Sequence, residues 1–147
     1  MKKTLLICCI TGSLALGVKA QVTVTSTNVP NSIQTSFKGA YPDASSMNWR
    51  MKDDLYRVNF TRDGVKQMAS YDASGKLVSS GSMVKETELP SAIGTSVKSA
   101  YAGRSIDEIY KIDKNGTPGY WITLKGSPDT KMMYDTNGQV IKDKTNW

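Results

Sequence analysis

The sequence contains no histidine, and its two cysteines, Cys8 and Cys9, both lie near the start of the 147-residue chain. A serine or cysteine hydrolase usually needs histidine as the base beside its nucleophile, and zinc sites are built largely from imidazole and thiolate ligands. The 12 glycines are spread among turn-like segments and form no loop of the kind that cradles phosphate groups. These absences favour a protein that is not an enzyme and that holds neither a metal nor a cofactor.

The acidic residues offer no ready catalytic or calcium-binding arrangement. Asp53–Asp54 and Asp107–Glu108 are adjacent pairs, and neighbours on a strand point to opposite faces, so neither pair forms the acid and base of a glycosidase. Asp72 in "YDASGK" and Asp135 in "YDTNGQ" could supply calcium ligands. These segments are more typical of turns that begin with aspartate and place glycine in the left-handed conformation. A hydrolase that uses carboxylates or lysine is therefore the weakest functional hypothesis.

Residues 1–20 have the pattern of a secretory signal peptide. "MKK" is a basic start, "TLLICCITGSLALGV" is an apolar stretch shorter than a membrane span, and "VKA" offers a small-residue cleavage site before Gln21. A short N-terminal anchor helix is the alternative. Cleavage removes Lys2, Lys3 and Lys19, so the formal charge falls from +6 to +3, and it also removes both cysteines. We therefore expect a disulfide-free periplasmic or secreted protein with no stable membrane span and no affinity for nucleic acid.

The remaining 127 residues contain an internal repeat in which three blocks recur in the same order. "VPNSIQTSFKGAY" returns as "LPSAIGTSVKSAY", "LYRVNF" returns as "GYWITL", and "YDASGKLV" returns as "YDTNGQVI". The short segment "WRM", which contains Trp49, is aligned with "YKI", which contains Tyr110. The sequence therefore predicts a single domain, residues 21–147, built from two repeats, residues 29–84 and residues 89–142.

Each repeat is expected to begin with a helix and to continue with strands. Ile33, Phe37 and Tyr41 fall at the spacing of one helical face, and the second repeat preserves this pattern. Strand-like segments follow, separated by turn sequences such as "KDD", "RDG" and "KNGTPG". We expect an α+β fold with a helix and an antiparallel meander of three or four strands in each repeat. Both helices would cover one side of the sheet or sheets, and the other face would stay open to solvent.

A "P-x-x-I…K-x-A-Y" helix, then short strands and "Y-D-x-x-G-x-[LV]", in tandem behind a signal peptide, resembles the PepSY-like family. These exported proteins, common in Bacteroidetes, have a β-lactamase-inhibitor-protein-like (BLIP-like) fold. The resemblance covers nearly all of the mature chain and implies a periplasmic or secreted module that binds or inhibits another protein. It implies no catalytic residues. Because the β-lactamase inhibitor protein has disulfides that this chain lacks, inhibition of a β-lactamase is not implied.

The open sheet face is where we expect a partner to bind. Alternation in "GYWITL" directs Trp121 away from Tyr120 and Ile122, which should face the helix, and the counterpart of Trp121 in the first repeat is Arg57. Tryptophan and arginine are enriched in binding hot spots, and methionine suits an adaptable contact surface. The alignment assigns six residues to this partner-binding face: Trp121, Arg57, Met68, Met133, Lys111 and Ile109. Packing of these residues against the other repeat is the alternative.

Two hypotheses about function remain. The first is an exported, non-enzymatic interaction module that binds a protein or peptide of the cell envelope or the exterior through the open sheet face, with an inhibitory or regulatory effect. The alternative is a binding protein for a small apolar or cell-envelope ligand, held in a pocket between the two repeats. Trp49 is expected in the core, and Trp147 is left unassigned.

Overall fold

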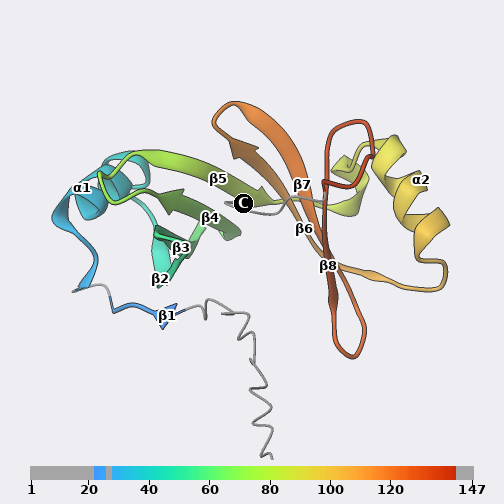
Figure 1. Ribbon diagram of the computed structural model, residues 1–147, viewed down its shortest axis with the longest axis horizontal. Coiled ribbons are helices and arrows are strands. Elements are labelled where there is room, and N and C mark those ends of the chain that lie inside the picture. The colour runs from blue at the N-terminus through green and yellow to red at the C-terminus, as the bar shows by residue number, and fades with distance from the viewer. Residues whose placement is uncertain (1–21, 26–27, 142–147) are drawn as a thin grey trace, which may run out of the picture.

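The computed structural model describes residues 22–25 and 28–141, in which eight antiparallel strands form one sheet and two α-helices pack on it (Figure 1). The expected signal segment and Trp147 lie outside the described residues. The elements follow in the order β1 (Val22–Thr23), α1 (Asn31–Ala40), β2 (Ser45–Lys52), β3 (Leu55–Arg62), β4 (Val65–Tyr71), β5 (Leu77–Met83), a 3₁₀ turn (Glu86–Glu88), α2 (Ser91–Ala100), β6 (Ile106–Lys114), β7 (Thr117–Leu124) and β8 (Thr130–Tyr134).

One continuous sheet joins the two halves of the chain. We call α1 to β5 the N-terminal half and α2 to β8 the C-terminal half. The strands lie in the sheet in the order in which they occur along the chain. β5 closes the gap between the halves because it pairs with β6, Ser79 opposite Lys114 and Met83 opposite Tyr110. The expected α+β class is confirmed, and the choice between one sheet and two, which the sequence left open, is settled as one.

Both helices are short and depend on the sheet beneath them. Each has ten residues and follows a proline, Pro30 for α1 and Pro90 for α2. Isolated helices of this length are marginal in water, so burial of their apolar face must hold them in place. That face is buried in both helices, through Ile33 and Phe37 in α1 and through the corresponding Ile93 and Val97 in α2. Figure 1 shows the two helices near opposite ends of the curved sheet.

Two-residue turns make three of the hairpins. Asp53 and Asp54 join β2 to β3 with φ angles of 53° and 61°. Asp63–Gly64 joins β3 to β4, and Asn115–Gly116 joins β6 to β7; both residues of each turn have a positive φ angle. Turns with positive φ at both central residues match the right-handed twist of the strands, which explains the choice of aspartate, asparagine and glycine. The turns predicted at "KDD" and "RDG" are confirmed, whereas only Asn115–Gly116 of "KNGTPG" is a turn and Thr117 already begins β7. Asp53–Asp54 is a turn rather than a pair of catalytic acids.

The "Y-D-x-x-G" motif docks a turn of the sheet against each helix. In the first copy Tyr71 is fully buried beneath α1, and Asp72 Oδ1 accepts hydrogen bonds from the backbone N–H groups of Ser74 (2.9 Å) and Lys76 (3.1 Å). A Cβ atom on Gly75 would lie 3.0 Å from the backbone carbon of Ser32 in α1. Glycine is therefore required both by the positive φ of 90° and by the close approach of the helix.

The second copy of the motif repeats this arrangement under α2. Asp135 Oδ1 accepts from the N–H groups of Asn137 (2.9 Å) and Gln139 (2.8 Å). A Cβ atom on Gly138 would lie 2.7 Å from the carbonyl oxygen of Ala92, and the hydroxyl of Ser96 donates to the Gly138 carbonyl at 2.8 Å. Both aspartates thus serve as turn residues, as the sequence favoured.

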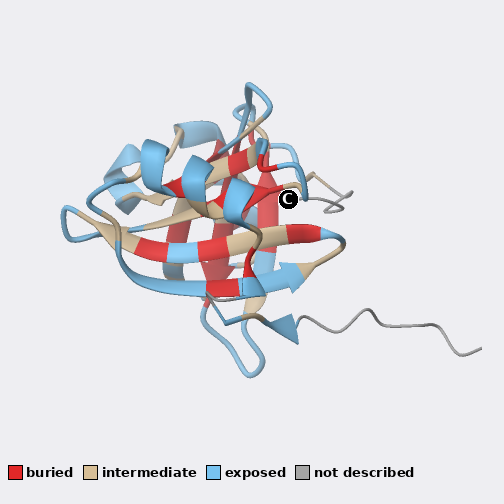
Figure 2. Cartoon of the chain, turned by 90° about the vertical axis from the view of Figure 1, so that its left-hand side faces the viewer, coloured by how far each residue is buried: buried red, intermediate tan, exposed pale blue. Residues whose placement is uncertain are grey.

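The hydrophobic core consists of two clusters on the same face of the sheet, which we call the helix-covered face. Trp49, Val58 and Ala69 are aligned across β2, β3 and β4 beneath α1. Ile109 and Ile122 are aligned across β6 and β7 beneath α2. The register through β5 places both sets on one face. Figure 2 shows the buried positions on the strands and on the inner side of the helices. Trp49 is a core residue, as predicted.

The alignment of Trp49 with Tyr110 is wrong by one residue. Tyr110 pairs with Trp121 and lies on the opposite, helix-free face, whereas Ile109 is only 2% exposed and belongs to the core beneath α2. Side chains alternate along a strand, so a shift of one residue moves every side chain to the other face. Ile109 and Lys111 therefore lie on the helix-covered face, and their predicted placement on the open face is corrected.

The helix-free face is also less open than expected. No helix of the described residues packs against it, but Ile112, Met133 and Ser79 on this face are buried. On the same face Trp121 and Arg57 are partly exposed, and Asn59 is exposed. The helix-free face thus combines buried and accessible side chains.

Candidate binding site on the helix-free face

A cavity of about 220 Å³ opens on the helix-free face. Its lining reaches from β2 to β8, although six strand spacings of about 4.8 Å would separate these two strands by roughly 29 Å in a flat sheet. The sheet therefore curls around the cavity. We call it the basic cleft, and its lining residues are Arg50, Lys52, Arg57, Asn59, Met68, Ala69, Ser70, Ser79, Ile112, Trp121 and Lys131.

The basic cleft brings together three of the six predicted site residues. Arg57 on β3, Met68 on β4 and Trp121 on β7 all line it. Met133 lies opposite Trp121 on β8, on the same face, but it is fully buried and does not line the cleft. Ile109 and Lys111 do not line the basic cleft, because their side chains lie on the helix-covered face of the sheet.

Arg57 is the most constrained charged group in the cleft. Its Nε atom is buried and has no hydrogen-bond partner among the described residues. Burial lowers the pKa of the Arg57 guanidinium, because desolvation disfavours the charged form, and the nearby Asp53 opposes this effect. Arginine stays protonated under all ordinary conditions. A positive charge is thus held partly out of water with one donor unsatisfied.

Three further cations surround Arg57, and no carboxylate lines the cleft with them. Arg50 is exposed, and its Nε donates to Asn48 Oδ1 at 3.2 Å. Lys52 lies 3.8 Å from Asp53 at the β2–β3 turn, and Lys131 is exposed on β8. Sequence reasoning did not find these cations. Arg50 is aligned with Arg57 across the β2–β3 pair, but that register is known only from the folded sheet.

A second, more polar cavity of about 340 Å³ adjoins the basic cleft and shares Asn59 with it. Lys66 Nζ lies 2.9 Å from Glu108 Oε1 in this cavity, so the cation here is already paired with an acid. Burial, and next the charge of Glu108, raise the pKa of Tyr110. The lining of this cavity thus holds one cation and one acid, whereas the lining of the basic cleft holds four cations and no acid.

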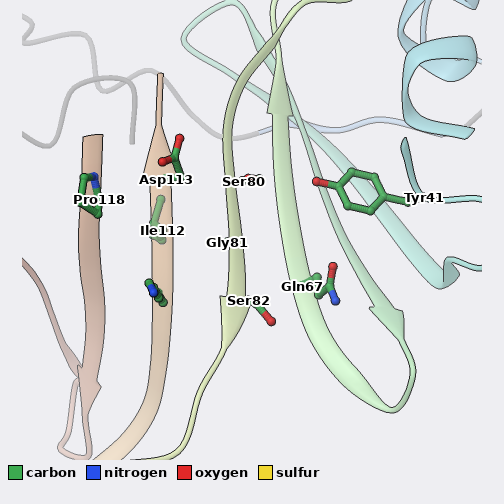
Figure 3. A pocket seen from close by; sticks show the side chains of 9 residues that line it. Tyr41, Gln67, Ser80, Gly81, Ser82, Ile112, Asp113 and Pro118 are labelled. Carbon is green, nitrogen blue, oxygen red and sulfur yellow. The ribbon is translucent and has the colours of Figure 1, made fainter. Parts of the chain in front are cut away.

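A pocket of about 250 Å³ lies on the helix-covered face between the two halves (Figure 3). Tyr41 reaches over it from the end of α1, and Lys111 and Asp113 line it from β6. Gln67 and Ser82 also line it, together with the apolar Ile112 and Pro118. Lys111 therefore lies at a different site from Trp121.

The largest of these cavities, about 640 Å³, lies beside α2. Leu89, Val97, Tyr101 and Ile106 form its apolar part, and Arg104 lies in its wall. Val97 is aligned with the larger Phe37 of α1 in the recurring sequence blocks.

Two other features of the described part of the chain bear on function. None of the helices in residues 22–25 and 28–141 is long and apolar enough to cross a membrane. Across the same residues, no group of three or more histidine, cysteine, aspartate or glutamate side chains is placed to hold a metal ion.

Comparison with known proteins identifies a family and a fold. The family model described as "Putative beta-lactamase-inhibitor-like, PepSY-like" matches residues 18–79 and 54–142. The search of curated proteins finds no match. A Bacteroides eggerthii structure described as "putative periplasmic proteins" is 16% identical, covers 78% of this chain and 86% of its own, and has a TM-score of 0.67. A BLIP-like protein of Bacteroides fragilis is 19% identical, covers 80% and 92%, and has a TM-score of 0.58. The fold is therefore BLIP-like.

Proposed function

The chain belongs to the PepSY-like, beta-lactamase-inhibitor-like family, and from this premise we propose that it is an exported, non-enzymatic module that binds a protein or peptide through the basic cleft. Export is supported by the signal-like segment at residues 1–20 and by the periplasmic description of the Bacteroides eggerthii structure. An inhibitory or regulatory effect on the partner is supported by the family description. Duplication of one helix-and-meander unit is supported by the recurring sequence blocks.

The convergence of Arg57, Met68 and Trp121 on one cavity carries this proposal. These residues are on three different strands, and no helix of the described chain covers them. A partly exposed tryptophan beside an arginine and a methionine has the composition of a binding hot spot. Trp121 acts as the apolar anchor, and Arg57 supplies directional polar contacts.

The test compares partner capture by the mature chain, residues 21–147, with capture by two variants. Trp121→Ala removes the anchor, and Met47→Ala removes a side chain that is 51% exposed on β2 outside the cleft. Envelope and secreted fractions of the source organism supply the partner, and melting curves verify that each bait is folded. We expect Trp121→Ala to stay folded and lose the captured protein, and Met47→Ala to keep it. Equal capture by both variants would move the binding site away from the cleft.

A second candidate function rests on the cavity beside α2. Its volume of about 640 Å³ falls within the range of small-molecule sites, and the apolar side chains of Val97 and Ile106 line it. On this alternative the protein carries a small apolar or cell-envelope ligand there. Native mass spectrometry of the purified protein would detect such a ligand as added mass, and Val97→Phe should fill the cavity and abolish it. Unmodified mass and no thermal shift across a lipid and glycan panel would reject the alternative.

A further inference from the structure

We propose that the basic cleft selects polypeptide segments in which a carboxylate group stands beside a large apolar side chain. This inference rests on the proposed function and specifies the chemistry of the partner. It is carried by three observations on the helix-free face: a cavity lining with four cations and no acid, a buried donor without an acceptor among the described residues, and an apolar wall next to both.

The charge of the cleft is of one sign. Arg50, Lys52, Arg57 and Lys131 line it, and no aspartate or glutamate does. Asp53, whose charge acts on Arg57 and which lies 3.8 Å from Lys52, is in the β2–β3 turn and does not line the cleft. The neighbouring cavity differs, because an acid, Glu108, is part of its lining and lies 2.9 Å from Lys66. Like charges gathered in a concave site raise the local concentration of anions.

Arg57 has a donor that an anion would satisfy. Its Nε is buried without a partner among the described residues, at the cavity wall. A guanidinium presents parallel N–H groups that match the two oxygens of a carboxylate. Buried polar groups in native proteins are nearly always hydrogen-bonded. A carboxylate in the cleft would accept from this donor and compensate the desolvated charge.

The apolar wall distinguishes a polypeptide from other anions. Met68, Ile112 and Trp121 line the cavity beside the cations, so a ligand that is only charged would leave this surface unused. A flat membrane surface cannot enter a cavity around which the sheet curls. A peptide can place an acidic and an apolar side chain side by side, because its successive residues differ in chemistry.

The experiment selects ligands from a display library of random dodecapeptides with the mature chain as bait. Recovered peptides are resynthesised with glutamate and aspartate replaced by glutamine and asparagine, and affinities are measured at low and high ionic strength. We expect acidic residues next to aromatic or aliphatic residues to be enriched. We expect amide replacement, high salt, or Arg57→Met in the protein each to weaken binding by about tenfold.

A matched control variant and a vesicle-binding measurement distinguish peptide recognition by the cleft from other kinds of binding. Arg62→Met makes the same chemical change on the helix-covered side of β3, where Arg62 Nε lies 3.5 Å from Asp63, and it should leave affinity unchanged. Peptides that require Trp121 but show no acidic enrichment would overturn this inference and leave the proposed function standing. Failure of the folded protein to recover any peptide would overturn both. Binding only to phosphatidylglycerol vesicles would replace the polypeptide with an anionic lipid and overturn the inference.

Discussion

The two halves of the sheet support their helices with different side chains. Under α1 the ring of Phe37 meets Trp49 and Phe60 edge-on, with centroids 5.3 Å and 5.1 Å apart. Under α2 the corresponding position is Val97, and it packs in a mainly aliphatic cluster with Ile109 and Leu124. Edge-to-face ring pairs stabilise a fold by more than the burial of their apolar area alone would give. The smaller Val97 is accompanied by the cavity of about 640 Å³ beside α2.

The two halves therefore differ in how much of the space next to their helix is filled by side chains. The ring cluster fills the space beneath α1, whereas the C-terminal half leaves space beside its helix. On the helix-free face the halves differ again, because the aligned positions of "LYRVNF" and "GYWITL" hold Arg57 and Trp121. Charge comes mainly from the N-terminal half, and the aromatic anchor comes from the C-terminal half. The basic cleft therefore exists only because one sheet joins them.

The largest expected loss of stability comes from truncating a buried side chain that each helix directs toward the sheet, Phe37 in α1 and Val97 in α2. Phe37→Ala should lower the free energy of unfolding by about 4 kcal/mol, because it deletes a buried ring and leaves a cavity. Val97→Ala should cost about 2 kcal/mol, since it removes only two buried methyl groups beside space that already exists. Urea unfolding of both variants measures the difference. Equal losses would show that ring packing does not distinguish the halves.

A somewhat smaller effect is expected where the turn glycine meets its helix. Gly138→Ala forces a Cβ atom to within 2.7 Å of the Ala92 carbonyl oxygen at a φ of 81°, so we expect a loss of about 3 kcal/mol. Gly116→Ala is the matched control, because its φ is 84° and its Cβ would meet nothing within 4 Å. It should cost about 1 kcal/mol from backbone strain alone. Thermal unfolding that finds equal losses would refute the docking role of the motif.

The two buried motif tyrosines should respond in opposite directions. Tyr71 Oη is buried without a partner among the described residues, so Tyr71→Phe should be neutral or stabilise by up to about 1 kcal/mol. Tyr134 Oη donates to Met132 Sδ at 3.6 Å, and Tyr134→Phe should lose about 0.5 kcal/mol. Chemical denaturation at neutral pH tests the signs. A clear loss in Tyr71→Phe would show that its hydroxyl makes a stabilising contact.

Tyr71 should also make the stability of the fold depend on pH under alkaline conditions. Burial raises the pKa of Tyr71 from 10.0 to about 12. The unfolded chain therefore loses this proton first, and the stability present below pH 10 declines as the pH rises toward 12. Tyr71→Phe should reduce this decline, which unfolding curves between these pH values would measure. An unchanged slope would assign the decline to other groups.

The smallest effect concerns the turn aspartate of the N-terminal half. The Ser74 hydroxyl is the main cause that lowers the pKa of Asp72, followed by the Lys76 backbone N–H. The charged carboxylate thus stabilises the fold above its ordinary pKa, and this contribution disappears as the pH falls through the lowered value. Ser74→Ala should raise the Asp72 pKa in an NMR titration, and Ser74→Thr should preserve it. No change in Ser74→Ala would exclude the hydroxyl as the cause.

Much of the site could be predicted from alternation on one strand, and the rest required the register between strands. Trp121 and Arg57 were placed correctly because each was assigned relative to its own neighbours on "GYWITL" and "LYRVNF". Ile109 and Lys111 were misplaced because their faces were inferred by aligning Tyr110 with Trp49 across a variable turn. Arg50 and Lys131 were missed because nothing along the chain brings β2 near β8.

The sequence by itself determined the local structure of this protein. Apolar spacing after Pro30 and Pro90 specifies the helices, and turn residues with positive φ specify the hairpins. These choices depend on interactions within a few residues, so they can be read along the chain. Only the tertiary structure decided that β5 and β6 make one sheet and that this sheet curls into a cleft. Twist and pairing accumulate over all the strands, and the position of each charge at the cleft depends on that sum.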